Sequence, residues 1–422
     1  MPPLTRLLLP LALSLGLAAC TPRTKARLAV AKDWEVLPPL GVSHNCALPK
    51  YYAPDTAHLD FWPIKFIRLN HHVFDRADVN ANFDSVAGPQ QIQRIVDLSN
   101  EWFERAPRPR LPVDDPPPRV PNRMRFVTSP DTDAPGDDGV YFHYDDAVPW
   151  HVHRGRDRNI GDRTAFERYG TRTDSVLNVL YLAHHPDSVA SPHYKPDVSG
   201  VAVGGMMVKM VYTWDTYTTP WPHHANLMHE VGHVYNLSHS WTRQDGCDDT
   251  PPHPNCWSPN AKRGCPVVSN NLMDYTQDAI TLTPCQVGRV HQRMSKLDSR
   301  QRKFLNPLWC SGRAGASAQL RDTFRLLHET DLESDLELLA GAYLQVRCRL
   351  SLPAGKRIIV HPGATLDLAG GTLHNSCGLP WAGIEVLRRG RLRGRLIWRE
   401  GSTVEDTDVP LPEPTDVRTV RR

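Results

Sequence analysis

The chain has 422 residues, of which 40% are hydrophobic and 23% are charged, as in ordinary globular proteins large enough for more than one domain. Its formal net charge of +3 is too small to indicate a nucleic-acid-binding surface, and the sequence has no aromatic-rich basic motif, so we expect no nucleic acid as a partner. The 38 prolines predict long irregular connections.

Residues 1–19 have the pattern of an export signal. The apolar run 7–17 is too short to span a bilayer as a helix. It leads into Leu17-Ala18-Ala19-Cys20, which resembles a bacterial lipobox. The resemblance implies cleavage before Cys20 and acylation of this residue, and several acyl chains would give stable anchoring. Thr21 follows the cysteine, which favours the outer membrane, at its periplasmic or cell-surface face. The alternative is a plain secretory signal followed by an incidental cysteine.

The next part of the chain is expected to form a tether and then an α+β domain. Residues 20–46 are polar and predict a tether or pro-segment. Residues 88–105 carry apolar side chains at helical spacing, and the proline-rich stretch 107–121 must be a loop. Alternation or apolar runs predict strands at 64–69, 124–127, 140–142, 176–182 and 201–212.

The second half of the chain changes character twice. Residues 241–282 are rich in Pro, Asn, Asp and Cys and predict an irregular lobe, and 284–305 return to a helical pattern. Short alternating runs between glycines from about residue 346 predict a small all-β domain. The expected boundaries are 47–310 for the main domain, 311–345 for a connector, 346–408 for the β domain and 409–422 for a tail.

The strongest chemical signal is the run from His229 to His239. His229 and His233 lie four residues apart, on one face of a helix, and can bind one metal ion. His239 is a third ligand from beyond the helix, so the chain must turn sharply after His233. Three protein ligands leave the fourth zinc position open for water, as in catalytic sites. Glu230 can take the proton of that water.

This pattern, HExxHxxxxxH, resembles that of the metzincin zinc peptidases. Asn236 stands where that clan usually has glycine, and asparagine tolerates the left-handed backbone that the turn needs. The stretch 271–275 resembles the methionine turn of the clan. The resemblance implies that Met273 forms the floor under the imidazoles and that Tyr275 stabilises the oxyanion.

Residues 227–294 are more specifically similar to the pappalysin-like metzincins, through 248–251, 283–287 and Arg289. The resemblance implies a two-lobed catalytic domain with a twisted sheet and helices above and an irregular, disulfide-clipped lobe below. It also implies hydrolysis of peptide bonds, and binding of calcium, for which Asp245, Asp248 and Asp249 are candidate ligands. A solvated acidic turn is the alternative for these three aspartates.

Eight cysteines remain after Cys20, an even number that suggests disulfides in an exported protein. The resemblance places four of them in the lower lobe, with Cys247–Cys265 and Cys256–Cys285 as the preferred pairing among three connectivities. Cys348 and Cys377 could clip the β domain.

Cys46 has three interpretations. It could form a disulfide, for instance with Cys310. The resemblance to pappalysin-like enzymes instead implies a free thiolate that blocks the zinc in a latent enzyme, and the third interpretation is an unpaired thiol without a role. Parity favours the disulfide, because a free Cys46 leaves another cysteine without a partner.

Three further features have weaker implications. The stretch 201–208 is the expected edge strand for extended peptide substrates. The pairs at His71, His184 and His223 lack ligand spacing and are expected at the surface or in loops. The C-terminal domain resembles short β-helix modules with room for two or three coils, and Arg391, Arg393 and Arg395 would share one strand face, either as a solvated face or as a site for an acidic glycan.

The sequence therefore predicts a zinc-dependent endopeptidase that acts on protein or peptide substrates and is attached to a membrane by lipid. Two alternatives belong to other classes. One is an inactive, protease-like binding or adhesion lipoprotein, and the other is a zinc hydrolase of a non-peptide bond.

Overall fold

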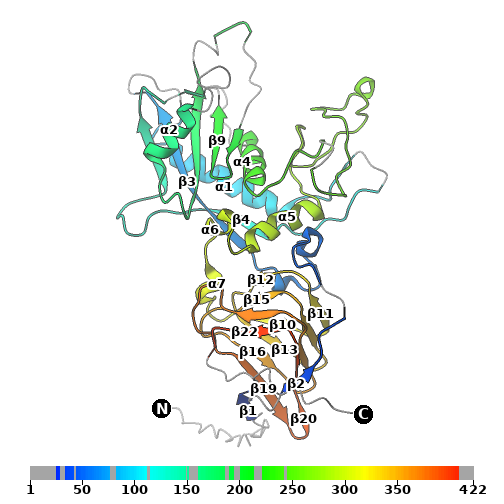
Figure 1. Cartoon of the computed structure of the whole chain (residues 1–422). Coiled ribbons are helices and arrows are strands. Elements are labelled where there is room, and N and C mark those ends of the chain that lie inside the picture. The colour runs from blue at the N-terminus through cyan, green and yellow to red at the C-terminus, as the bar shows by residue number, and fades with distance from the viewer. Residues whose placement is uncertain are drawn as a thin grey trace, which may run out of the picture.

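The computed structural model describes residues 25–28, 34–41, 44–76, 82–111, 115–148, 150–151, 160–185, 190–193, 200–212, 221–241 and 245–407. These residues form an α/β domain that sits on a β-rich C-terminal domain (Figure 1). The expected signal segment and the lipobox-like run that ends at Cys20 lie outside the described residues. Within them, no helix is long and apolar enough to cross a membrane.

The upper domain is built on a mixed sheet with the order β4-β3-β7-β9-β8, to which β5 and β6 are added beside β3 and β7. All its pairings are parallel except that of β8 with β9. The strands are β3 (Lys65–Asp75), β4 (Met124–Thr128), β5 (Val140–Tyr144), β6 (Trp150–His151), β7 (Leu177–His184), β8 (Gly200–Val203) and β9 (Met207–Tyr212). The predicted strands before residue 200 are confirmed.

Helices cover this sheet. The apolar stripe of α1 (Gly88–Arg105) faces the core with Ile92, Ile95 and Val96, and the predicted helix 88–105 is confirmed. The other helices of this domain are α2 (Ile160–Tyr169), α4 (Trp221–Val234), α5 (Pro284–Ser295), α6 (Arg300–Lys303) and α7 (Leu308–Ser311). Three short 3-10 turns are η2 (Pro49–Tyr52), η3 (Leu59–Phe61) and η5 (Ala261–Arg263).

Two predicted elements are broken in the structure. The strand expected over 201–212 is a hairpin, because Gly204 and Gly205 have positive φ angles of 58° and 64° and turn the chain between β8 and β9. The helix expected over 284–305 ends at Ser295 and restarts as α6, so that Leu297 lies exposed between them.

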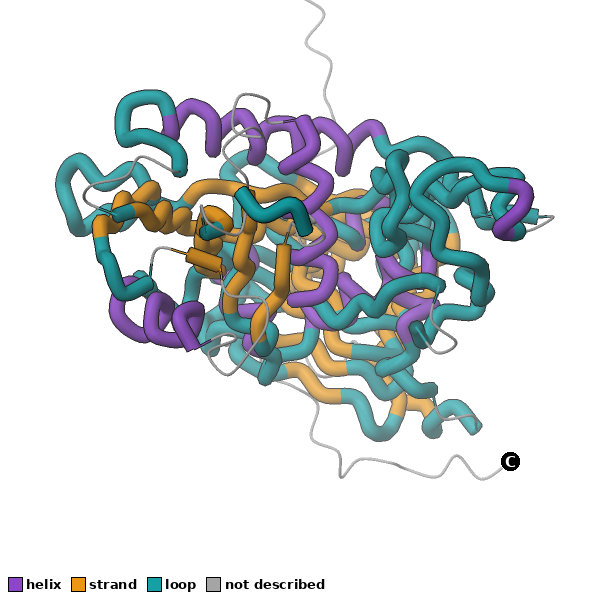
Figure 2. The backbone as a smooth tube through the Cα atoms, turned by 90° about the horizontal axis from the view of Figure 1, so that it is seen from above, coloured by secondary structure: helices purple, strands orange, loops and turns teal. Residues whose placement is uncertain are grey.

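Residues 245–283 form an irregular lobe beside the sheet, as predicted. Figure 2 shows this lobe as a group of loops on one side of α4, with one short helical turn. The absence of regular hydrogen-bonded ladders here is offset by disulfides and by side-chain hydrogen bonds to the backbone.

The C-terminal domain is a three-faced parallel β-helix. Its faces are the strand rows β10-β13-β16-β19, β11-β14-β17-β21 and β12-β15-β18-β22. Each coil places apolar side chains directly over those of the next, as in the register Leu344↔Leu366↔Leu396, and this stacking fills the core.

The strands of the β-helix are short. They are β10 (Ser317–Leu320), β11 (Thr323–Leu326), β12 (Thr330–Asp331), β13 (Asp335–Leu338), β14 (Tyr343–Val346), β15 (Arg349–Ser351), β16 (Ile358–Val360), β17 (Thr365–Leu368), β18 (Thr372–His374), β19 (Ile384–Arg389), β20 (Leu392–Arg393), β21 (Arg395–Arg399) and β22 (Thr403–Val404).

Two predicted boundaries are wrong. The connector expected at 311–345 contains the first strands of the β-helix, which begins at Ser317 and has more coils than predicted. The tether expected at 20–46 contains β1 (Lys25–Leu28) and β2 (Trp34–Leu37), which pair with β19 and β21. In both cases the short strands carry too few residues to show a period by themselves, and pairing with neighbouring coils decides their conformation.

A buried charge cluster joins the two domains. Asp331 of β12 accepts hydrogen bonds from Arg302 of α6 at 2.5 Å and from Arg349 of β15 at 2.5 Å. Lys65 of β3 contacts Glu333 at 3.4 Å. Burial alone would raise the pKa of Asp331, but Arg349 and Arg302 hold it far below the usual carboxyl value. The cluster therefore ties the base of the sheet to the first coils of the β-helix.

Candidate metal centre

Helix α4 ends in a Schellman motif that brings the third histidine back toward the first two. The N–H of Leu237 donates to Gly232 O at 3.0 Å, and the N–H of Asn236 donates to His233 O at 2.9 Å. Asn236 has a φ of 70°, which is the left-handed conformation expected from the sequence. The turn reverses the chain within a few residues, and this places His239 beside the helix that carries His229 and His233.

The structure brings the three predicted ligands together. Nε2 of His233 lies 3.1 Å from Nε2 of His229 and 3.1 Å from Nε2 of His239. Nδ1 of His229 lies 2.7 Å from Leu272 O, and Nδ1 of His233 lies 2.8 Å from Leu237 O. A carbonyl only accepts, so these Nδ1 atoms carry the hydrogens, and the Nε2 atoms of both rings point lone pairs into a shared space.

This arrangement fits a metal ion. Burial, together with the neighbouring imidazoles, lowers the pKa of His229 to about 3 and that of His239 to about 4, and burial also lowers the pKa of His233. Neutral imidazoles with converging lone pairs repel one another unless a cation lies between them. Four-coordinate zinc with nitrogens at about 2.05 Å needs ligand atoms about 3.3 Å apart, which is close to the observed spacing.

Met273 is fully buried and packs against α4 at Gly232. A Cβ atom at Gly232 would come within 2.7 Å of the Met273 sulfur, so the glycine between the two ligand histidines lets the methionine pack directly against α4. The role of Met273 as a floor under the imidazoles stays a prediction.

The side chains of Asn271 and Gln286 hold the Met273 turn in place. Asn271 Nδ2 donates to Gln286 Oε1 at 2.7 Å, and Gln286 Nε2 donates to Asn271 Oδ1 at 3.1 Å. Asn271 Oδ1 also accepts from the N–H of Met273 at 2.9 Å. Gln286 forms a capping box with Thr283 at the start of α5. The cap of α5 thus fixes the backbone to which His229 is hydrogen-bonded.

Glu230 faces the sheet edge next to the three histidines. Its side chain is buried, and burial raises its pKa to about 7, against the effect of a hydrogen bond from the backbone of Ala202 in β8. A Cβ atom at Gly200 would lie 2.6 Å from Glu230 Cγ. The carboxylate therefore occupies space that exists only because residue 200 is glycine.

The aromatic rings of Tyr275 and Trp241 lie against the histidine group. The ring of Tyr275 lies 4.8 Å from the ring of His239 and 5.8 Å from that of His229, and its side chain is exposed. Trp241 stacks on His239 with a ring separation of 4.2 Å and an interplanar angle of 10°. The sequence interpretation missed Trp241. Its position, two residues after the predicted third ligand, was the sequence feature that could have indicated a contact with His239.

Comparisons with known proteins give likenesses among solved structures alone. No protein-family model matches the sequence, and no curated protein matches it. Among solved structures, mirolysin in complex with compound 9 aligns with a TM-score of 0.40 and 17% sequence identity, over 57% of this chain and 96% of that chain.

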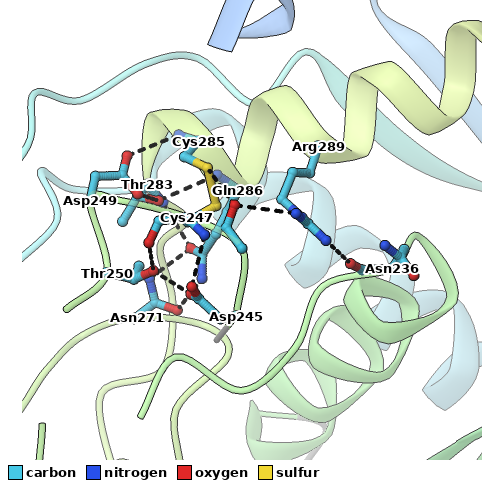
Figure 3. Close-up of a disulfide and its surroundings, with 11 residues drawn as sticks. Asn236, Asp245, Cys247, Asp249, Thr250, Asn271, Thr283, Cys285, Gln286 and Arg289 are labelled. Atoms are coloured by element: carbon cyan, nitrogen blue, oxygen red, sulfur yellow. Dashed lines mark hydrogen bonds between the residues drawn. A yellow bond between two sulfur atoms is a disulfide. The ribbon is translucent and has the colours of Figure 1, made fainter. Parts of the chain in front are cut away.

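Further hydrogen bonds attach the ligand loop to α5. Arg289 donates from its two terminal nitrogens to Asn236 O and Gly246 O, each at 3.2 Å (Figure 3). The guanidinium thereby connects the turn after His233 with the loop of Gly246. No feature of the sequence alone gave Arg289 this contact.

The three aspartates expected to bind calcium do not form a candidate metal group among the described residues. Asp245 accepts from the Cys247 N–H at 2.8 Å and from the Thr250 hydroxyl. Asp249 accepts from the Thr283 hydroxyl at 2.7 Å and from the Cys285 N–H at 2.9 Å. Figure 3 shows both carboxylates directed at these internal partners. Their oxygens thus organise the loop around the start of α5.

All eight cysteines are paired, as expected from their number, but the predicted partners are wrong. The irregular lobe contains the disulfides Cys247–Cys285 and Cys256–Cys265, with Cα atoms 5.6 Å and 6.4 Å apart. Asp249 explains the first pair, because its hydrogen bonds bring the loop of Cys247 onto the N-terminus of α5. The second pair closes a short loop that also has a bridge between Asn260 and Cys265.

The other two disulfides cross between segments that the sequence treated separately. Cys348 and Cys377 do not pair with each other. Instead Cys46 pairs with Cys348 and Cys310 pairs with Cys377. Cys46 therefore has its sulfur in a disulfide with the β-helix, which contradicts both the latency thiolate and the pairing with Cys310.

The histidine pairs are only in part where the sequence placed them. His184 is half-buried and His185 is exposed, but His71 and His72 are buried in β3 and His223 and His224 are buried in α4. His71 contacts the Tyr181 hydroxyl at 3.0 Å and His72 contacts Asn178 at 2.8 Å. The rings of His71 and His72 thus have polar partners inside the fold.

Proposed function

We propose that this protein is a zinc-dependent endopeptidase that hydrolyses peptide bonds of extended substrates. The observation that carries the proposal is the convergence of the Nε2 atoms of His229, His233 and His239, with a glutamate beside them and an edge strand next to that glutamate. His229 and His233 both carry their hydrogens on Nδ1, so no hydrogen bond can join their two Nε2 atoms, and a metal ion accounts for that approach.

Zinc is the metal that this donor set favours, because imidazole suits it and three protein ligands leave a position open. When bound, zinc supplies Lewis acidity to the reacting water and to the scissile carbonyl. The proposal that zinc binds here is supported by the close spacing of the three Nε2 atoms and by the hydrogen bonds that orient the rings of His229 and His233.

The chain's own residues supply the other parts of the reaction. Glu230 is the base, since it follows the first ligand and its carboxylate accepts a backbone hydrogen bond from the edge strand, the side from which substrate would approach. Tyr275 lies against the histidine group, where its hydroxyl can hydrogen-bond to negative charge that develops on the carbonyl oxygen. The exposed edge of β8 can add an extended peptide by main-chain hydrogen bonds.

The test uses the full exported chain and a synthetic peptide library read by mass spectrometry, with and without a chelator. We expect chelator-sensitive cleavage by the wild type. Glu230→Gln should keep the metal and lose activity by several orders of magnitude, because the carboxylate is a base and not a ligand. Glu104→Gln, at an exposed position in α1, is the matched control.

The outcomes separate the candidate functions. Metal binding without any cleavage would favour the inactive binding protein. Release of acyl groups from peptides whose backbone stays intact would favour a hydrolase of a non-peptide bond. Equal turnover by Glu230→Gln would remove the assigned base.

We also propose export and lipid anchoring at Cys20, on the basis of the lipobox-like run that ends there. Cys20→Ala should move the protein from the membrane fraction to the soluble fraction. The fractionation is done at high salt, which screens electrostatic attraction to the membrane, and a variant that still sediments with membranes there would argue against this anchor.

A further inference from the structure

The end of the β-helix farthest from the metal centre carries a group of arginines. Strands β19 and β20 form a hairpin there (Figure 1). We call residues 388–395 the arginine hairpin. It contains five arginines and no acidic residue. All five side chains are exposed, namely Arg388, Arg389, Arg391, Arg393 and Arg395. Their positive charge exceeds the formal net charge of the whole chain, which is +3.

The close placement of arginines within the hairpin is electrostatically unfavourable when only water surrounds them. The register places Arg388 directly opposite Arg393, and like charges at opposed positions destabilise a strand pair. Arg389 lies opposite Leu392, whose side chain is 57% exposed. Cations around an exposed leucine match a surface that offers negative charge above an apolar layer, as anionic lipid headgroups do.

The position of the N-terminal strand places the proposed lipid anchor at the same end of the molecule, and this step rests on that anchor. Strand β1 runs antiparallel to β19, with Lys25 opposite Arg388. Going back along β1 toward Cys20 therefore corresponds to going forward along β19 toward Arg389. Cys20 is five positions before Lys25, and five residues span at most about 18 Å. A lipid on Cys20 would thus enter the bilayer near the arginine hairpin.

We propose that the arginine hairpin is a membrane-docking surface that binds anionic lipid headgroups. The β-helix then acts as a spacer between the bilayer and the upper domain, because the metal centre lies at the opposite end of the molecule (Figure 1). The disulfides Cys46–Cys348 and Cys310–Cys377 and the charge cluster at Asp331 keep the upper domain fixed on this spacer. The proposal does not depend on the peptidase assignment.

The test measures electrostatic docking apart from the lipid anchor. The full exported chain with Cys20→Ala is sedimented with vesicles of phosphatidylcholine alone or mixed with phosphatidylglycerol, at low salt. We expect binding to the anionic vesicles only. The double substitution Arg389→Gln with Arg391→Gln should weaken this binding about 25-fold, since each arginine near an anionic surface contributes about fivefold.

The matched control removes the same charge elsewhere. Arg321→Gln with Arg325→Gln changes two exposed arginines in the first coil, next to the upper domain, and should bind like the parent chain. Both variants are checked for unchanged circular dichroism and melting temperature. Equal loss in the two variants, or equal binding to neutral and anionic vesicles, would overturn the proposal. The proposal would also be overturned if the chain failed to bind anionic vesicles but bound a sulfated polysaccharide through the same arginines.

Discussion

A single methyl group added at Gly200 should displace the proposed base, Glu230, without affecting the binding of the proposed metal ion. In Gly200→Ala the new Cβ atom would lie 2.6 Å from Glu230 Cγ, 2.9 Å from Oε1 and 3.0 Å from Cδ. Non-bonded carbon atoms are in optimal contact at about 3.5–4.0 Å. The neighbouring atoms belong to a flexible side chain, so the fold is kept and the carboxylate moves by roughly 1 Å.

A displacement of that size should be costly for the reaction. Misplacing a reacting group by about 1 Å can lower the rate about 100-fold, which corresponds to about 2.7 kcal/mol in the activation free energy. The assay is kcat/KM on the best peptide from the library, together with metal content by mass spectrometry. We expect a loss of about 100-fold in kcat/KM with the metal content of the wild type.

Gly41→Ala is the matched control, because a Cβ atom there would have nothing within 4 Å. It should leave kcat/KM and metal content unchanged. The reasoning would be refuted if Gly200→Ala kept the kcat/KM of the wild type. It would also be refuted if the variant lost its metal, since the contact is with the base and not with the ligands.

Three further substitutions test other parts of the molecule. Tyr275→Phe should lower kcat by roughly 10–1000-fold with little change in KM, and a change in KM alone would contradict its role. Asp331→Asn should lower the free energy of unfolding by about 3–5 kcal/mol, because its arginine partners stay buried without a counter-charge, whereas the exposed Asp298→Asn should be neutral in the same denaturant titration. The lowered pKa of Asp331 makes this stabilisation complete above about pH 4 and progressively smaller as the pH falls below it, so the difference from wild type should shrink in acid. Replacing Cys46 and Cys348 together by alanine should lower the melting temperature and leave kcat/KM per folded molecule unchanged, and a gain of activity without proteolysis would instead support a latency thiol.

Local patterns in the sequence were sufficient for much of the site. His229 and His233 lie on the same face of one helix because they are four residues apart. This placement follows from helix geometry and requires no tertiary contact. Asn236 could be assigned a left-handed turn because its side chain tolerates that backbone, and its φ of 70° agrees. Strong apolar periodicity likewise gave the limits of α1.

Contacts between segments far apart in the sequence could not be predicted from local sequence patterns. The even number of cysteines predicted disulfides, but four cysteines in one lobe allow several pairings. The pair Cys247–Cys285 forms because the loop that carries Asp249 packs on the start of α5. The stacking partner Trp241 and the guanidinium bridge of Arg289 depend on where the irregular lobe packs.

The sequence by itself determined the candidate residues of the centre, because the proposed ligands, base and turn lie within eleven consecutive residues, His229 to His239. One helix and its C-terminal motif set the geometry of this stretch. Only the tertiary structure decided how the chain is assembled around it. The strands of the β-helix and the N-terminal β1 and β2 are stable through pairing with neighbouring coils, so no short window of sequence contains the hydrogen bonds and apolar stacking that specify them.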